Sequence, residues 1–259
     1  MNVNIDIAVL LEHLVQYLWP FMRIGAFLMV MPLIGSSFVP VKVRVLLGMA
    51  LTTVMVPVLP VYAAPEILSL EGVITVFQEI FIGIAMGFVV QLVFDAISLG
   101  GQVIAMSMGL GFAVFLDRAR GVNIPVLGQL FLMLGMLIFL SLNGHLALIK
   151  LIAESFYLQP ISSGGLSTAA ILALLEWSSQ VFAVALKIAI PAISALIVVN
   201  LSFGVMSRAA PTLNLFAVGF PVAMLLGFVV IFLNMGGLQE NVSIAFGEAL
   251  AMVPTLLGR

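Results

Sequence analysis

Residues 100–115, GGQVIAMSMGLGFAVF, form a stretch that is too apolar for an ordinary surface loop and too rich in glycine for a regular membrane span. The charged cluster Asp117-Arg118-Ala119-Arg120 follows almost directly. A glycine in a helix interior costs about 1 kcal/mol, so we do not expect a continuous helix through residues 108–112. Irregular backbone at membrane depth is tolerated only where protein buries it or where it lines a cavity. The sequence therefore predicts an apolar loop between helices, which is a candidate gate.

The composition is that of an integral membrane protein. Of the 259 residues, 63% are hydrophobic and 8% are charged, whereas soluble domains carry about 25% charged residues. The net charge of −2 and the lack of a basic stripe argue against nucleic acid as a partner. The chain contains no cysteine, which excludes disulfides, thiolate metal sites and cysteine nucleophiles. The N-terminus lacks the basic segment of a signal peptide, so we expect the first span to act as the insertion signal.

Hydropathy predicts about six membrane spans, each of which needs roughly 20 apolar residues. A weakly amphipathic tail follows them at residues 238–259, and we expect a single domain over residues 1–259. Lys42 and Arg44 in the first loop favour an outside N-terminus under the positive-inside rule, whereas Lys150 falls on the opposite side. The predicted spans lie near 8–33, 45–63, 73–95, 126–149, 180–200 and 213–236.

Two of the helical segments are longer than a bilayer requires. Residues 168–206 are compatible with a helix throughout, with Ser167 as its N-cap and Pro191 as a kink. At 1.5 Å per residue such a helix reaches about 58 Å, against a hydrocarbon core of about 30 Å. Residues 71–106 are similarly long. We therefore expect long kinked helices that tilt, break or extend out of the bilayer.

Four charged side chains fall inside the predicted spans. Each costs about 2.5–3.5 kcal/mol at a helix centre on insertion scales, so each needs a partner or a wet surface. One interpretation is an ion or proton relay. The other is ion pairing between subunits, with snorkelling of the residues near helix ends. The second is favoured because no span carries two acidic residues at helical spacing. The four residues are Arg23, Glu79, Asp95 and Lys187.

No catalytic motif is present in the sequence. His13 and His145 stand outside any metal-binding motif, and a helix-terminal or interfacial role is favoured for His145, which follows Asn143-Gly144 at a span end. The chain has no P-loop and neither a serine-type nor an aspartyl-type intramembrane protease signature. We therefore expect a non-enzymatic protein without a metal or cofactor.

Two further patterns concern packing. Gly83 and Gly87 form a GxxxG motif, which predicts that this helix face contacts protein rather than lipid. The side chains of Met106, Met108, Phe112 and Phe115 either fill a core or line a pliable seal that excludes water. Their spacing leaves both interpretations open.

Several fragments together resemble the FliR/SctT family of type III secretion export-gate proteins. The strongest match is RAAPTLNLFAVGFP, residues 208–221, where the family shows an Arg-x-Ala-Pro turn followed by Asn, Phe and Gly-Phe-Pro. A second match runs from the third predicted span into its continuation, and a third covers residues 123–145. Each fragment is weak alone, but length and span count extend the resemblance over essentially the whole chain. The matching residues are Arg208, Ala210, Pro211, Asn214, Phe216, Gly219, Phe220 and Pro221; Glu79, Gly83, Gly87, Gly101, Gln102 and Gly109; and Asn123, Pro125, Asn143, Gly144 and His145.

This resemblance implies an all-α, polytopic protein whose helices form hairpins, lifted largely out of the bilayer, within a helical hetero-oligomeric export gate. It implies a location in the bacterial inner membrane at the flagellar basal body. FliP and FliQ would be the partners around a central pore, with FlhB and FlhA nearby and unfolded flagellar proteins as the cargo. The segment matching residues 106–122 is the family's plug, in which Met106, Met108, Phe112 and Phe115 would face the pore and Asp117 would anchor the loop. The plug residues are Met106, Met108, Gly109, Gly111, Phe112, Phe115 and Asp117.

The chain departs from the family at one position of the plug. Arg118 follows Asp117, where the family often has proline, so pairing of these charges with a partner subunit is an alternative way to fix the loop. The expected function is a subunit that forms and seals an export channel. The alternatives are an injectisome gate subunit and a stand-alone secondary transporter that uses Glu79 and Lys187. Paired discontinuous helices in two related halves, which are typical of such transporters, are missing.

Overall fold

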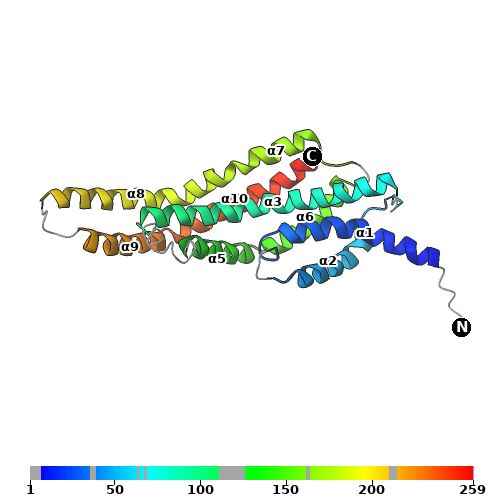
Figure 1. The fold of residues 1–259 in the computed structure, drawn as a ribbon, viewed down its shortest axis with the longest axis horizontal. Coiled ribbons are helices and arrows are strands. Elements are labelled where there is room, and N and C mark those ends of the chain that lie inside the picture. The colour runs from blue at the N-terminus through cyan, green and yellow to red at the C-terminus, as the bar shows by residue number, and fades with distance from the viewer. Residues whose placement is uncertain are drawn as a thin grey trace. The chain divides into compact units, whose positions relative to one another are not determined.

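A computed structural model of the chain describes residues 7–35, 39–62, 65–66, 69–110, 126–161, 164–209 and 215–258. Within these residues the secondary structure is helical and contains no strand, which confirms the predicted all-α fold. Figure 1 shows the helices in chain order. They are α1 (Ile7–Val30), α2 (Val41–Met55), the short 3₁₀ helix η1 (Val56–Val58), α3 (Leu70–Ser107), α5 (Val126–Ser141), α6 (Gly144–Leu158), α7 (Thr168–Ser178), α8 (Gln180–Ala209), α9 (Leu215–Leu233) and α10 (Met235–Leu256).

Three segments of the described chain are long and apolar enough to cross a membrane, and the number rises to as many as five if each of two broken helix pairs counts as one span. Six spans were predicted. Helix α1 is not in this count, because its side chains are described only over residues 15–30. The three segments are Val41–Val58, Leu70–Ser107 and Thr168–Arg208.

Helix α3 is the long helix that the sequence predicts over residues 71–106. It begins where the Ser69 hydroxyl accepts the N–H of Gly72 at 2.9 Å, which is a side-chain N-cap. It then continues for 38 residues, or about 57 Å, well beyond the thickness of a hydrocarbon core. Two thirds (67%) of the most apolar window of α3 is buried inside the protein. Protein, rather than lipid, is therefore the main environment of this helix.

The second long segment is interrupted once. Ser167 caps α7 as predicted, because its hydroxyl accepts the N–H of Ala170 at 3.1 Å. The interruption falls at Ser179, between α7 and α8, whereas α8 continues as a helix through Pro191. The predicted span at 126–149 is also divided, because Asn143 adopts a left-handed conformation with φ of 55° between α5 and α6.

The chain divides into two compact units. The first comprises residues 1–92, 143–178 and 247–259, and the second comprises residues 93–142 and 179–246. The expectation of a single domain stays a prediction.

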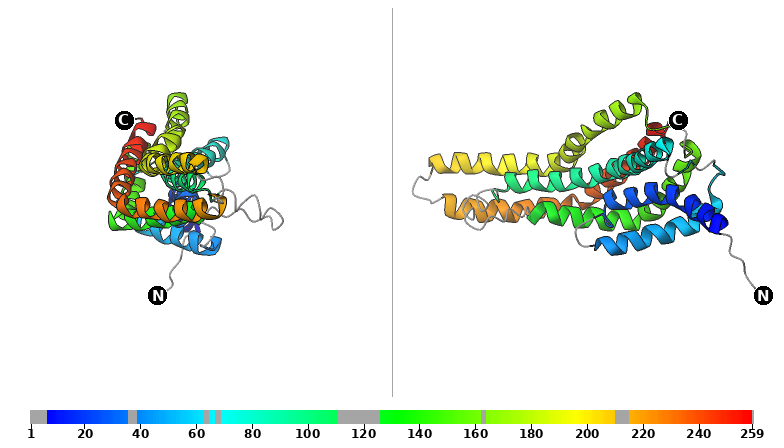
Figure 2. Two further views of the ribbon diagram at one scale, coloured as in Figure 1. Left: turned by 90° about the vertical axis from the view of Figure 1, so that its left-hand side faces the viewer. Right: turned by 45° about the vertical axis from the view of Figure 1, so that its right-hand side comes forward.

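In the first unit α1 and α2 form a hairpin, visible in Figure 2 as the two blue helices side by side. A Cβ added at Gly48 of α2 would lie 3.3 Å from the ring of Phe21 and 3.8 Å from the Cα of Gly25 on α1, so the two helices approach closely. Trp19, Ile24 and Phe27 of α1 are buried, as are Ile82 and Met86 of α3. These side chains make the core on which α3 packs.

In the second unit α8 packs along α9, and Figure 2 shows the two helices (yellow and orange) as a long hairpin. The core of this unit contains a cluster of three phenylalanine rings. Phe94 lies edge-on to Phe139 and Phe246, with ring centroids 5.5 and 4.9 Å away, and the rings of Phe139 and Phe246 are 4.9 Å apart. Edge-to-face contacts of this kind stabilise a core beyond the area they bury.

Candidate functional site

The end of α3 is the point from which the predicted plug departs. The N–H of Leu110 bonds to the carbonyl of Ala105 at 3.0 Å, and the N–H of Gly109 bonds to the carbonyl of Met106 at 3.1 Å. This pair of bonds is the Schellman motif, which requires a left-handed residue just past the helix end. Gly109 supplies it with φ of 83°. The glycine that was predicted to loosen the backbone therefore ends the helix at a defined place.

Met108 and Gly109 are fixed on α9 by two close contacts. Met108 is fully buried, and a Cβ added at Gly227 would lie 2.6 to 2.8 Å from its Cγ, Cε and Sδ atoms. The ring of Phe220 covers Gly109 so closely that a Cβ there would lie 2.5 Å from the ring. The end of α3 is thus held on α9 by two contacts, that of Met108 with Gly227 and that of Gly109 with Phe220.

The other predicted plug residues divide into one that is described and four that are not. Met106 lies in the last turn of α3 and leaves 72% of its surface exposed. Of the two methionines, then, Met106 faces outward and Met108 is buried within the chain, and the pore-facing role of both stays a prediction. Gly111, Phe112, Phe115 and Asp117 lie outside the described residues, as do Asn123 and Pro125.

Just before this helix end, α3 packs closely on α5. A Cβ at Gly101 would lie 2.8 Å from the carbonyl oxygen of Leu127 and 2.9 Å from Phe131, so only glycine fits. The side chain of Gln102 lies against Gly128 and donates a long hydrogen bond of 3.4 Å to the hydroxyl of Ser98. Gly101 and Gln102 therefore lie in the close contact between α3 and the first turns of α5.

The GxxxG motif packs on α1 of the same chain. A Cβ at Gly83 would collide with the carbonyl oxygen of Arg23 and come within 3.0 Å of Ala26. A Cβ at Gly87 would lie 3.0 Å from Val30 and 3.1 Å from the carbonyl oxygen of Phe27. The prediction that this face contacts protein is confirmed.

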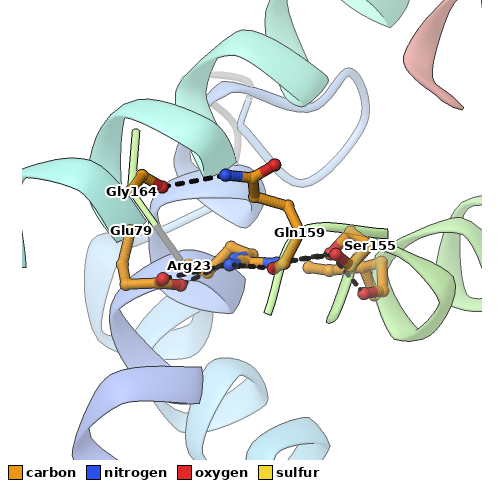
Figure 3. Close-up of polar contacts among 6 residues, drawn as sticks. Arg23, Glu79, Ser155, Gln159 and Gly164 are labelled. Atoms are coloured by element: carbon orange, nitrogen blue, oxygen red, sulfur yellow. Dashed lines mark hydrogen bonds and ion pairs between the residues drawn. The ribbon is translucent and has the colours of Figure 1, made fainter. Parts of the chain in front are cut away.

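Beside this contact lies a buried ion pair between α1 and α3, drawn in Figure 3. The Arg23 guanidinium donates from Nε and Nη2 to the two carboxylate oxygens of Glu79, at 2.7 and 3.0 Å. Its Nη1 donates to the carbonyl and hydroxyl oxygens of Ser155 at 2.9 and 3.2 Å, and Nη2 also donates to the carbonyl of Gln159 at 2.9 Å. These five bonds match the five N–H donors of arginine. The guanidinium also stacks over the ring of Phe156, with its Cζ 4.3 Å from the centroid.

The network extends from Gln159 to the following loop, because the Gln159 amide donates to the carbonyl of Gly164 at 2.9 Å (Figure 3). Arg23 and Glu79 are 0% and 2% exposed, so a polar group left without a partner here would be costly. The preferred sequence interpretation was pairing between subunits, and for this pair it is wrong, since both charges belong to one chain. Asp95 and Lys187, by contrast, are exposed.

The matched segment around residues 143–145 begins α6. Asn143 is the left-handed residue before the helix, Gly144 is buried, and His145 is half-buried in the first turn, which agrees with the expected helix-terminal position. The Nδ1 atom of His145 is buried and has no hydrogen-bond partner among the described residues.

The match at 208–221 spans the connection between α8 and α9. Arg208 is exposed in the last turn of α8, and a Cβ added at Gly219 would lie 3.9 Å from the ring of Phe203 across the hairpin. Pro221 lies inside α9, next to the Phe220 ring that covers Gly109. Ala210, Pro211 and Asn214 fall outside the described residues, and the side chain of Phe216 is not described.

Sequence reasoning missed the partners of Arg23 and of Met108. Ser155 and Gln159 complete the Arg23 network mainly through carbonyl groups, which carry no residue-specific signal. Gly227, which accommodates Met108, lies more than a hundred residues further along the chain. It is one of 23 glycines, and nothing in the sequence distinguishes it from the others. Among the described residues no group of three metal-ligating side chains is found.

Comparison with known proteins gives a consistent result. Residues 14–249 match the family model described as bacterial export proteins, family 1. The flagellar biosynthetic protein FliR of Escherichia coli K12 is 38% identical over 217 residues, which cover 84% of this chain and 83% of that protein. Proteins of the same name are 35% identical over 242 residues in Pectobacterium carotovorum, with 93% and 92% coverage, and 29% identical over 225 residues in Aquifex aeolicus, with 86% coverage of both.

Proposed function

The chain belongs to the family of bacterial export proteins that includes the flagellar biosynthetic protein FliR, and from this premise we propose that it helps to form and seal the flagellar export channel. It is an α-helical membrane protein related to flagellar export. The proposed role is that of a non-enzymatic subunit of the type III export gate, through which unfolded flagellar proteins cross the inner membrane during flagellum assembly. The proposed location is the basal body.

The observation that carries the proposal is the anchored end of α3. A plug needs a fixed base, because a segment that closes a channel must return to the same place. Met108 and Gly109 give such a base by packing on Gly227 and Phe220 of α9. Met106, on the exposed side of the same turn, is the described residue that we assign to the sealing surface. Its flexible thioether side chain suits a seal around varied shapes.

The setting of α3 supports a subunit within an assembly. This helix is longer than a hydrocarbon core is thick, and most of its apolar window is buried in protein. We propose FliP and FliQ as the neighbouring subunits, with FlhB and FlhA as associated components.

The ion pair argues against the stand-alone transporter. In that alternative Glu79 would bind a substrate or an ion. Its two carboxylate oxygens are instead both engaged by Arg23, whose remaining donors are engaged by Ser155 and Gln159. The network therefore acts as a structural clamp between α1, α3 and α6. The flagellar name of the relatives favours the flagellar role over that of an injectisome subunit.

The mass of the native species tests the proposal. The protein would be extracted in mild detergent from cells that express the flagellar export genes, purified through a tag and weighed by native mass spectrometry. We expect it to co-purify with two other small helical membrane proteins. A stable monomer or homodimer that moves a small solute in proteoliposomes would overturn the gate proposal and favour the transporter.

A further inference from the structure

The first half of α3 leaves one of its faces uncovered. Side chains on its other faces are packed, and Ile82, Met86 and Val89 are at most 1% exposed. On the uncovered face, large apolar side chains recur at alternating intervals of four and three residues, and each leaves between 39% and 79% of its surface exposed. Such a row follows one side of a helix over about four turns. We call this row the α3 seam, and its members are Leu70, Ile74, Phe77, Phe81 and Ile84.

Two helices of the same unit border the seam. On one side the GxxxG motif of α3 packs on α1. On the other side, a Cβ at Gly165, just before α7, would lie 3.2 Å from the Gln78 side chain. Further along α7, Trp177 donates from Nε1 to the carbonyl of Val89 at 3.4 Å. Figure 1 shows this half of α3 between α7 and α1. The open face is therefore a narrow strip, which suits one further helix whose side chains fit between those of the seam as knobs into holes.

A cavity of about 430 Å³ opens at one end of the seam, where α3 begins. Leu70 and Ile74 belong to both the seam and the cavity, so the two surfaces are continuous. The cavity lining also includes an acidic and an amide residue, and none of its described residues is basic. The lining residues are Leu70, Glu71, Ile74, Thr75, Gln78 and Gly164.

Glu71 supplies a charge with which an incoming helix can pair. It is exposed, and no ion pair of its carboxylate is found within the described part of the chain. Arg23 is engaged by Glu79, and Lys150 pairs with Glu154 at 3.4 Å, so neither cation serves Glu71. Stabilisation of the helix N-terminus accounts for an acidic residue in the first turn of α3, but not for the cavity beside it. Acyl chains offer nothing to a carboxylate, whereas a Lys or Arg side chain forms a charge-assisted hydrogen bond with it.

We propose that the α3 seam and this cavity bind an α-helix of another protein chain. That helix lies along α3, packs apolar side chains between Phe77 and Phe81, and places one Lys or Arg beside Glu71. The inference deepens the proposed function and rests on it, because a helix of this kind belongs to a neighbouring subunit of an assembly. It adds the surface that the neighbour covers and the charge that it carries.

Photochemical cross-linking from the seam tests the proposal. Phe77, Phe81 and Ile84 would be replaced singly by p-benzoyl-phenylalanine in the full chain, co-expressed with the flagellar export genes. Variants that still support motility would be irradiated in native membranes, and the cross-linked sites would be mapped by mass spectrometry. The yield from position 77 would then be measured in the background of Glu71→Lys. Glu248→Lys is the matched control, since Glu248 is an exposed acidic residue of α10 in the same unit that lines neither the seam nor the cavity.

We expect all three positions to capture one helix of another protein, at sites that advance by about one turn from each position to the next. This helix should carry Lys or Arg one or two turns beyond the site captured from position 77. Glu71→Lys should lower the yield several-fold, Glu248→Lys should leave it unchanged, and changing that basic residue to Glu should restore the yield in the Glu71→Lys background.

Three results would overturn the proposal: phospholipid adducts in place of protein, capture of a second copy of this chain, or a yield that Glu71→Lys does not change. If the protein still co-purifies with two other small helical membrane proteins, any of these results leaves the export-gate role standing and removes the α3 seam alone. A monomer that captures no protein would remove both.

Discussion

Met108 lies directly against Gly227, so a side chain added at residue 227 would force the Met108 side chain to shift. A Cβ there would lie 2.6 Å from the Met108 Cγ, and Met108 itself is fully buried. This contact, with that of Phe220 on Gly109, fixes the end of α3 on α9. Because the predicted plug begins at this turn, the contact also fixes where the plug starts.

We predict that Gly227→Ala destabilises the protein by about 1–3 kcal/mol, the usual cost of overpacking a filled core. The change also shifts Met108, so export of flagellar proteins should fall. Thermal unfolding of the purified protein and secretion into the medium are the measurements. Gly204→Ala is the matched control, since an added Cβ there meets nothing within 4 Å. An equal effect of the two substitutions would show that the Met108 contact is unimportant.

At the helix end, Gly109→Ala should be harmful for two separable reasons. The left-handed conformation costs a non-glycine residue about 1–2 kcal/mol, and the new methyl group also collides with Phe220. Shortening the ring by Phe220→Leu relieves the collision but not the backbone strain. The double variant should therefore recover part of the loss in unfolding free energy caused by Gly109→Ala alone. Full recovery would mean that the conformation of residue 109 does not matter.

For the buried ion pair, removal of one partner should cost far more than removal of both. Arg23→Met leaves the Glu79 carboxylate buried without its partner, and such changes typically cost about 3–5 kcal/mol. The double variant Arg23→Met, Glu79→Leu removes both charges and should be considerably more stable than Arg23→Met alone. A double-mutant cycle on unfolding midpoints measures the coupling. Additive effects of the two substitutions would contradict the clamp.

Tyr62 provides a prediction that depends on pH. Burial, and then the nearby charge of Glu79, raise the pKa of the Tyr62 hydroxyl above its ordinary value of 10.0. This hydroxyl donates to the carbonyl of Gln16 at 2.5 Å. Because the folded-state pKa is raised, the stability that the protonated Tyr62 hydroxyl contributes is fully present below pH 10. This contribution is lost as the pH rises from 10 toward the folded-state pKa.

Wild-type protein should therefore exceed Tyr62→Phe in stability at pH 8 by about 1 kcal/mol, the usual net value of one hydrogen bond. This difference should shrink above pH 10. Unfolding curves of both proteins between pH 8 and 11 are the measurement. A difference that stays constant over this range would show that the pKa of Tyr62 is not raised.

Sequence patterns predicted the long helices well, because helix ends depend on local chemistry. The hydroxyl of Ser167 and the absence of proline between Glu71 and Met106 are visible in the sequence, and the cap and the long helix were both confirmed. The GxxxG motif likewise predicted a protein contact for Gly83 and Gly87.

What the sequence did not reveal are pairings between distant residues. The charges of Arg23 and Glu79 are evident in the sequence, but 56 positions separate them. Nothing local indicates that they share one interior. Met108 packs on Gly227, and one glycine in an apolar helix gives no signal that it accommodates a particular methionine. Asn143 divides a predicted span. Hydropathy did not indicate this division, because it does not show that an asparagine is left-handed.

The central claim is that a segment beginning at the anchored end of α3 seals an export channel. It is tested most directly by measuring ion conductance across the inner membrane after deletion of residues 109–115, with and without the other export-gate genes. We predict a large increase in conductance when those genes are present and none when they are absent. Unchanged conductance with the complete set of genes, in a variant that still assembles with its partners, would contradict the seal.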